Sequence, residues 1–444
     1  ALHAASINFD SYTGFCSLHR IGDRSIGIRI VQSVATLLIN MLTARYLGPS
    51  NFGLITYASS LVAFVLPIMQ LGFSNVLVQE IVNDSDAEGA ILGTSITLSL
   101  ISSACCIVGV TSFAFIANPN ELTTVLVCLL YSLILIFQAC DHVEFWYQAK
   151  LMSKYTSVIS LVSYVLVSLY KIYLLIAAKS IFWFALSNAL DYALISIGGI
   201  VLYRKLGGKK LSFSWKLGKR MFQKSKHYIL SSMMVTVFAQ TDKIMIKMMM
   251  DEAATGYYGA AVACAGMTSF VFGAIIDSFR PSIFEGQKES ERTFNYRLTM
   301  LYSIIIYLSL AQSVAMTLLS KWIIFILYGK AYEPAISALQ IIVWYTTFSY
   351  MGSVRNIWIL ANGKQNYLWK INMSGAIANV GLNAILIPVM GINGAAIASL
   401  STQFFTNVIV GYIIKPIRPN NKIIVESLKP EYLINAAEKL KRQV

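Results

Sequence analysis

Twelve apolar segments, each long enough to cross a membrane as a helix, follow one another along this chain. A bilayer core of about 30 Å needs roughly 20 apolar residues in a helical span. The segments lie at about 26–47, 52–72, 89–117, 122–140, 155–178, 181–203, 227–250, 256–276, 300–324, 335–353, 371–390 and 392–414. Twelve such helices leave only loops and a tail of the 444 residues, which excludes a sizeable domain outside the membrane. We therefore predict an all-α polytopic membrane protein with twelve transmembrane helices.

The composition agrees with a membrane protein. Charged residues make up only 13% of the chain and hydrophobic residues 56%, whereas soluble domains are about a quarter charged. The chain carries 35 Lys and Arg against 21 Asp and Glu, a net charge of +14. Because Lys and Arg gather in the cytoplasmic loops of polytopic proteins, we attribute this surplus to such loops and not to nucleic-acid binding.

The distribution of Lys and Arg over the loops tests the helix count. With both termini in the cytoplasm, the segments predicted inside contain 27 of the 35 basic residues, and the segments predicted outside contain only Lys179 and Lys330. If one helix were missed or added, every loop after it would change sides, and the basic loops would no longer all lie in the cytoplasm. One predicted inside loop, 73–88, is acidic and contains no basic residue.

A basic stretch near the middle of the chain suggests two halves. Residues 204–226 contain nine Lys or Arg and the pair Gly207-Gly208. A faint repeat, in which Phe52-Gly53 aligns with Tyr258-Gly259, indicates two parallel six-helix lobes with cargo between them. The predicted divisions are a disordered leader 1–20, an N-terminal lobe 21–203, a cytoplasmic linker 204–226, a C-terminal lobe 227–414 and a cytoplasmic tail 415–444.

Four motifs carry a resemblance to a known family. They are Ala44-Arg45-Tyr46-Leu47-Gly48-Pro49-Ser50-Asn51-Phe52-Gly53, Thr241-Asp242-Lys243-Ile244-Met245-Ile246 with Gly256-Tyr257-Tyr258-Gly259, Arg280-Pro281-Ser282, and Ile387-Pro388-Val389-Met390-Gly391-Ile392-Asn393-Gly394. In order and spacing they resemble the oligosaccharide, or O-antigen, flippases of the polysaccharide transporter family in the MOP superfamily. One departure is Val78-Gln79-Glu80, where such proteins usually carry an Arg.

The resemblance implies a function. Two lobes would move an undecaprenyl-diphosphate-linked oligosaccharide from the cytoplasmic to the periplasmic leaflet of a bacterial inner membrane by alternating access, among membrane lipids and beside a polysaccharide polymerase and a chain-length regulator. The sequence has neither a G-x-x-x-x-G-K-[ST] phosphate loop nor an H-E-x-x-H motif. We therefore expect no enzyme activity, no metal and no cofactor, and a proton or a sodium ion as the coupling ion.

Charged residues within or near the predicted spans are the candidate site, because each costs about 2.5 kcal/mol or more at the centre of a membrane helix. The basic candidates for a cavity that binds the lipid diphosphate are Arg29, Lys171, Lys243, Lys247, Arg280 and Arg355. The acidic candidates for coupling or charge pairing are Asp191, Asp242 and Asp277. The alternative for each residue is interhelical pairing or snorkelling, with Asp242–Lys243 and Asp277–Arg280 as predicted pairs.

Two other functions remain open from the sequence. A multidrug extruder on the same fold would export cations, but the first predicted helix carries Arg29 and Arg45 and no acid, which favours an anionic cargo. A non-transporting scaffold of a polysaccharide assembly complex would keep its function without the cavity charges. A membrane glycosyltransferase is disfavoured, because no acidic metal-binding motif is present.

Overall fold

The computed structural model describes the backbone of residues 11–434 and the side chains of residues 36–434. Within that range every regular element is helical, which confirms the all-α prediction. The longer helices are α1 (Ser11–Met69), α3 (Glu88–Ala117), α7 (Ser153–Ile176), α8 (Ile181–Lys205), α9 (Trp215–Met249), α10 (Glu252–Gly266), α11 (Ser269–Glu289), α12 (Glu291–Leu327), α13 (Ala335–Ala361), α14 (Leu368–Met390) and α15 (Ile392–Phe404). The shorter ones are α2 (Leu77–Asn83), α4 (Leu122–Ser132), α5 (Ile134–Cys140), α6 (Glu144–Ala149), the π-helix Phe405–Ile409, α16 (Val410–Ile413) and α17 (Arg418–Ser427). Helix α1 begins inside the predicted leader, and residues 1–10 of that leader lie outside the described residues.

Ten helical segments in the described part of the chain are long and apolar enough to span a membrane, compared with the twelve predicted. Two features account for the difference. Helix α1 contributes one segment although it joins two helices across a kink at Gly48. Helix α13 is rich in Ser, Thr, Tyr and Trp, which lower its mean hydropathy, and it is not among the ten.

The kink in α1 follows directly from its sequence. Gly48 has φ 72° and ψ 172°, a conformation that glycine adopts without the steric cost of a Cβ atom. Pro49 comes next and cannot donate a backbone hydrogen bond to the preceding turn. The chain therefore changes direction here, at the boundary predicted between the first two spans.

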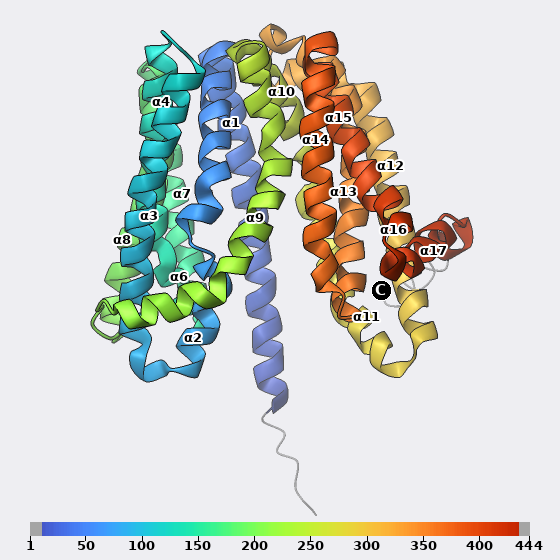
Figure 1. The fold of residues 1–444 in the computed structure, drawn as a ribbon, viewed down its shortest axis with the longest axis horizontal. Helices are drawn as coiled ribbons and strands as arrows, with labels where there is room; N and C mark the ends of the chain where they lie inside the picture. Colours follow the sequence, from blue (N-terminus) through green and yellow to red (C-terminus); the bar gives the residue numbers. More distant parts are fainter. Residues whose placement is uncertain (1–10, 435–444) are drawn as a thin grey trace, which may run out of the picture.

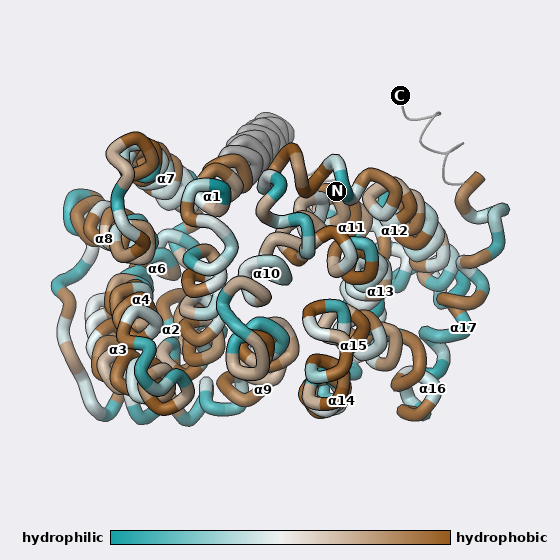
Figure 2. The backbone as a smooth tube through the Cα atoms, turned by 90° about the horizontal axis from the view of Figure 1, so that it is seen from above, coloured by the Kyte–Doolittle hydropathy of each residue, from teal (hydrophilic) through white to brown (hydrophobic). Residues whose placement is uncertain are grey.

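The helices gather on two sides of a central set (Figure 1). Helices α2–α8 lie on the left of this view and α11–α17 on the right, with α1, α9 and α10 between them. Helix α1 contacts α3, α4 and α7 on one side and α9 and α10 on the other, while α9 packs on α14 and α10 on α13. The view from above shows the same order, with α9 and α10 between the two sides (Figure 2). The central helices therefore connect all the others.

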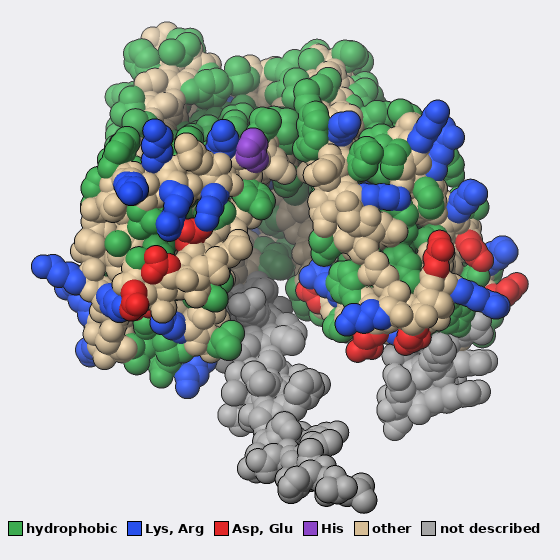
Figure 3. Space-filling view, turned by 60° about the horizontal axis from the view of Figure 1, so that its bottom comes forward, with side chains coloured by type: hydrophobic (Ala, Val, Ile, Leu, Met, Phe, Trp, Pro, Cys, Tyr) green, Lys and Arg blue, Asp and Glu red, His purple; other side chains and the backbone are tan. Residues whose placement is uncertain are grey.

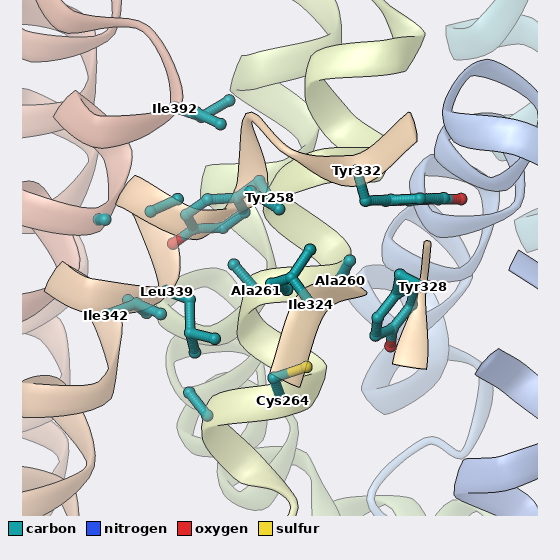
Figure 4. Close-up of a cluster of buried hydrophobic side chains, with 14 of the residues drawn as sticks. Tyr258, Ala260, Ala261, Cys264, Ile324, Tyr328, Tyr332, Leu339, Ile342 and Ile392 are labelled. Carbon is teal, nitrogen blue, oxygen red and sulfur yellow. The ribbon is translucent and has the colours of Figure 1, made fainter. Parts of the chain in front are cut away.

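The largest buried hydrophobic cluster surrounds α10 (Figure 4). Ala260, Ala261 and Cys264 of this helix are fully buried. Small side chains let neighbouring backbones approach closely, which is how membrane helices associate where water supplies no hydrophobic driving force. Tyr258 and Tyr328 complete the cluster with their rings. This packing fixes α10 against α12 and α13.

The acidic loop and the basic linker lie against each other at the lower end of Figure 1, where α2 and the start of α9 meet. Glu80 is only 5% exposed, and its carboxylate binds Arg220 Nη2 at 3.0 Å and Lys224 Nζ at 2.5 Å. Lys209 pairs with Asp86 at 2.9 Å in the same region. The acidic loop 73–88 is thus the counter-charge of the linker, and both lie at the same end of the helices.

The lower face also shows how the two sides separate (Figure 3). This face is hollowed between the left and right groups of helices, and Lys and Arg side chains lie on both sides of the hollow. Helix α9 starts at this end with Trp215, so the second half of the predicted linker 204–226 is helical.

Candidate substrate cavity

A cavity of about 870 Å³ lies among α1, α4, α7, α8 and α10. Its walls combine hydroxyl and amide groups with aromatic rings. The polar lining residues are Thr36, Asn40, Thr43, Thr56, Ser59, Ser168 and Asn188, and the aromatic ones are Phe52, Tyr131, Tyr164, Phe184 and Tyr328. The cavity therefore offers many neutral hydrogen-bonding groups inside an otherwise apolar helical array.

Two predicted site residues, Lys171 and Asp191, line this cavity from α7 and α8. Lys171 Nζ donates to Asn188 Oδ1 at 3.1 Å. Asp191 Oδ1 accepts from Ser163 Oγ at 2.6 Å. Each charge thus has a neutral partner, and among the described lining residues the two charges balance.

Asp242 lies in a different buried cluster, formed by α9, α10, α14 and α15. Its carboxylate is 6% exposed and accepts hydrogen bonds from Tyr258 Oη at 2.6 Å, from Asn383 Nδ2 at 2.6 Å and from Ser399 Oγ. In the described part of the chain, Asn379 Nδ2 and Asn383 Oδ1 are buried in this cluster without a hydrogen-bond partner. The cluster is therefore rich in oxygen atoms and contains one carboxylate.

The structure gives Asp242 and Lys243 different hydrogen-bond partners. Lys243 Nζ donates to Gln240 Oε1 at 3.0 Å, one turn away on the same face of α9. Consecutive residues of a helix do not face each other, which is why these neighbours point to different surroundings. Both residues lie in the membrane-spanning part of α9, and their roles in coupling and cargo binding stay predictions.

Lys247 forms ion pairs with two carboxylates. It is 5% exposed, and its Nζ lies 2.8 Å from Glu121 Oε2 and 3.4 Å from Glu252 Oε2. The ammonium group of Lys247 and a hydrogen bond from Thr124 hold the pKa of Glu121 below its ordinary value. Lys247 therefore ties the end of α9 to the connection before α4. The role of Glu121 could not be predicted from the sequence, because this residue lies 126 residues from its partner.

The remaining predicted residues whose side chains the structure describes lie apart from the cavity. Arg280 and Asp277 pair at 3.0 Å on the exposed surface of α11, as their spacing predicted. Arg355 is buried in α13, where its Nη1 donates to Thr406 O at 2.7 Å in the π-helix, and its Nε has no partner among the described residues. The side chain of Arg29 lies outside the described residues.

Comparison with known proteins assigns the chain to a family. Residues 42–337, which include the whole cavity except Thr36, Leu37, Ile39 and Asn40, match the family described as polysaccharide biosynthesis protein. The chain belongs to this family. The capsular polysaccharide biosynthesis protein CapF of Staphylococcus aureus is 21% identical over 396 residues, which cover 87% of this chain and 97% of CapF. The uncharacterized membrane protein MJ1068 of Methanocaldococcus jannaschii is 26% identical over 241 residues, 50% of this chain and 47% of that protein.

Two solved structures share the fold. The lipid II flippase MurJ, in an inward closed conformation, has a TM-score of 0.71 at 14% identity, over 90% of each chain. An inward-facing multidrug resistance MATE transporter of the MOP superfamily has a TM-score of 0.65 at 14% identity, over 90% of this chain and 96% of the transporter. This family member is therefore a multi-pass membrane protein that shares its fold with these two structures.

Proposed function

We propose that this protein is a flippase that moves an oligosaccharide linked to undecaprenyl diphosphate from the cytoplasmic to the periplasmic leaflet of a bacterial inner membrane. The observation that carries the proposal is the polar cavity of about 870 Å³ within a chain of the polysaccharide biosynthesis family. Lys171 and Asp191 would be costly beside this cavity unless they were used, because charged groups at membrane depth are expensive. The names of CapF and of the lipid II flippase support the same class of cargo.

The proposed architecture has twelve spans in two six-helix lobes. Counting the two parts of α1 separately, and adding α13 to the apolar segments, gives twelve. The hollow of the lower face between the left and right helices supports a passage between lobes that rock in alternating access. The basic residues around this face support a cytoplasmic location for it. We propose the cytoplasmic side for both termini as well.

Transport would be tested with the purified protein in vesicles. Lipid-linked oligosaccharide, labelled on its sugar, is placed in one leaflet, and a membrane-impermeant reagent then reports how much has reached the other leaflet. We expect transfer that depends on the protein and exceeds that of protein-free vesicles. Equal rates with and without the protein would contradict the proposal.

Coupling to a proton or a sodium ion is the second part of the proposal, and the Asp242 cluster is the proposed place. A carboxylate among neutral oxygen-bearing side chains can hold a proton or a hard cation, which prefers oxygen ligands. Asp242→Asn keeps the size of the side chain but removes its charge. We expect this variant to bind cargo and to lose acceleration by an imposed proton or sodium gradient. A variant that still responds to the gradient would exclude Asp242 as the coupling site.

A multidrug extruder is the second candidate, favoured by one observation. Asp191 gives the cavity a carboxylate, which a cationic drug requires, and the MATE transporter shares the fold. Efflux of ethidium from cells that produce the protein would distinguish the two. We expect none above the level of cells with the empty vector, whereas efflux abolished by Asp191→Asn would favour the extruder.

A further inference from the structure

The first turns of α9 lie across the other helices instead of along them. Helix α9 has 35 residues and is about 52 Å long at 1.5 Å per residue, whereas about 20 residues cross a bilayer core of about 30 Å. Figure 1 shows where the excess length lies: α9 starts at the lower left, runs across the lower end of the left group of helices and then turns upward. Because the spanning helices run from the upper to the lower end, these first turns lie along the membrane surface.

The first turns of α9 are fixed to the left group of helices. Directly before the helix, Ser214 N donates to Thr94 Oγ1 of α3 at 3.0 Å. Farther along, Ser225 Oγ donates to Leu71 O, just after α1, at 2.7 Å. One stripe of these turns is buried against the left group and consists of Gly218, Met221 and Ser225. The remaining sides of the helix are therefore presented in a fixed orientation.

A neighbouring side of these turns combines aromatic and basic residues. They are Trp215, Lys219, Phe222 and Lys226, which together form the amphipathic face. Because their spacings are four, three and four residues, they fall within about 60° of one another around the helix axis. All four side chains are exposed, Trp215 by 68% and Phe222 by 41%. The ring of Phe213, also exposed, has its centroid 6.4 Å from that of Trp215 and extends the aromatic part of this face.

Other basic residues of these turns serve the protein itself. Arg220 and Lys224 lie about 150° around the helix from the amphipathic face, and both bind the buried carboxylate of Glu80. Lys219 and Lys226 are turned away from that ion pair and point to the outside of the molecule. The view of the lower face shows basic side chains gathered over this region (Figure 3).

A position at the membrane surface explains this combination of residues. Trp favours the boundary between hydrocarbon and headgroups, and Lys can extend its ammonium group from there into the headgroup layer. Helices with Trp or Phe on one side and Lys beside them lie in the membrane surface, where anionic lipids strengthen their binding. A soluble anion or a nucleic acid would satisfy the two lysines but would leave the exposed rings of Trp215 and Phe222 in water.

We infer that the amphipathic face is a binding surface for the headgroups of anionic phospholipids. The rings of Trp215 and Phe222 lie in the membrane boundary, and the ammonium groups of Lys219 and Lys226 bind lipid phosphates. The inference does not depend on the cargo. Since α9 continues from this surface to the central set of helices, lipid bound here fixes the lower end of a helix that contacts both groups.

The test measures which lipid surrounds Trp215. The full chain is reconstituted into vesicles with equal amounts of phosphatidylcholine and phosphatidylglycerol. Only one of the two lipids carries brominated chains, which quench nearby tryptophan fluorescence, and the preparation is repeated with the other lipid brominated. The chain contains seven Trp, so the emission of the wild type minus that of Trp215→Phe isolates Trp215.

Two double variants locate the charges responsible. Lys219→Gln combined with Lys226→Gln removes both charges of the amphipathic face. The matched control, Lys288→Gln combined with Lys422→Gln, changes the net charge equally but removes exposed lysines of α11 and α17 in the right group. Each double variant is measured with and without Trp215→Phe, so that the emission of Trp215 is isolated in the same way.

We expect brominated phosphatidylglycerol to quench Trp215 more strongly than brominated phosphatidylcholine. This preference should fall by about fivefold or more in the variant of the amphipathic face and stay unchanged in the control. About 1 M salt, at which the Debye length is about 3 Å, should abolish the preference in the wild type without any substitution. Equal quenching by the two lipids, or none by either, would overturn the inference. So would a preference that persists in high salt or in the variant of the amphipathic face, or one that both double variants lose equally.

Discussion

The upper and lower ends of the molecule are held together by different kinds of contact. At the upper end of Figure 1, α1 is joined to helices from the second half of the chain. Arg45 Nη2 donates to the carbonyls of Phe325 and Ile326 in the last turn of α12, at 2.9 and 2.7 Å, and Tyr332 Oη donates to Ala44 O at 2.8 Å. At the lower end, the ion pairs of Glu80 join α2 to the start of α9.

The backbone crossing at the upper end is closer still. A Cβ atom at Gly53 would lie 1.7 Å from the carbonyl O of Glu252, and one at Gly256 would lie 2.1 Å from the carbonyl O of Pro49. These contacts between α1 and the second half of the chain lie at the upper end, whereas the lower face is hollowed. The difference teaches that opening the upper end must break contacts between distant parts of the chain, while the lower ion pairs can persist.

The largest effect should come from filling the crossing. Gly53→Ala places a methyl group into the backbone of Glu252 and should destabilise the protein by about 3 kcal/mol, since overpacking forces backbone shifts. The midpoint temperature of thermal unfolding of the purified protein should fall, and so should the abundance of the protein in membranes. Gly109→Ala is the control, because a Cβ atom there meets nothing within 4 Å, and it should stabilise α3 slightly. If Gly53→Ala and Gly109→Ala had the same unfolding temperature and the same abundance, the close crossing at Gly53 would not be what stabilises the upper end.

The second effect concerns the lower end. Glu80→Gln removes a carboxylate that is 5% exposed and leaves Arg220 and Lys224 without it. We expect a loss of about 2 kcal/mol, below the cost of breaking a fully buried pair, because both basic side chains are half exposed. Limited proteolysis should then cut between α8 and α9 faster, without a change in the accessibility of a cysteine placed at Pro49. Increased labelling at that cysteine would mean that the two ends are coupled.

The third effect should be smaller. Arg45→Met removes two hydrogen bonds to α12. Because Arg45 is exposed, we expect the variant to lose only about 1 kcal/mol of stability. The change should favour a state with a more open upper end, visible as faster labelling of a cysteine placed at Ala253. Lys321→Met, on the exposed surface of α12, is the matched control. Labelling that is no faster than in the control would contradict the assignment of Arg45 to the closure.

The smallest effect is a pH dependence at Glu121. Because Lys247 holds the pKa of this carboxyl below 4.5, the pair stabilises the closed upper end above that pH. The contribution is lost as the pH falls through the lowered pKa, and it should amount to less than about 1 kcal/mol, since Glu121 is partly exposed. The measurement is the midpoint temperature of thermal unfolding of the wild type and of Glu121→Gln, from pH 7 to pH 3. The difference between the two temperatures should be constant above pH 5 and should shrink below pH 4.5. A constant difference throughout would rule out the pair.

The sequence was informative where contacts are local. Apolar segments, the break at Gly48-Pro49 and the pair Asp277–Arg280 depend on neighbouring residues, and the structure contains all three. The partners of Asp242 could not be predicted in this way, because Ser399 lies 157 residues away. Nor could the partner of Lys247, because Glu121 lies 126 residues away.

The crossing of Gly53 and Gly256 has a mechanical consequence. Because two backbones touch there with no side chains between them, the contact resists separation but offers little resistance to a small rotation. From Gly53 to the end of α1 at Met69 the helix runs about 24 Å at 1.5 Å per residue. A turn of about 10° around the crossing would therefore swing the far end of this segment by about 4 Å, more than the width of a water molecule. The crossing of Gly53 and Gly256 would thus serve as a pivot, about which a small rotation of α1 at the upper end displaces the lower end of this segment by several ångströms.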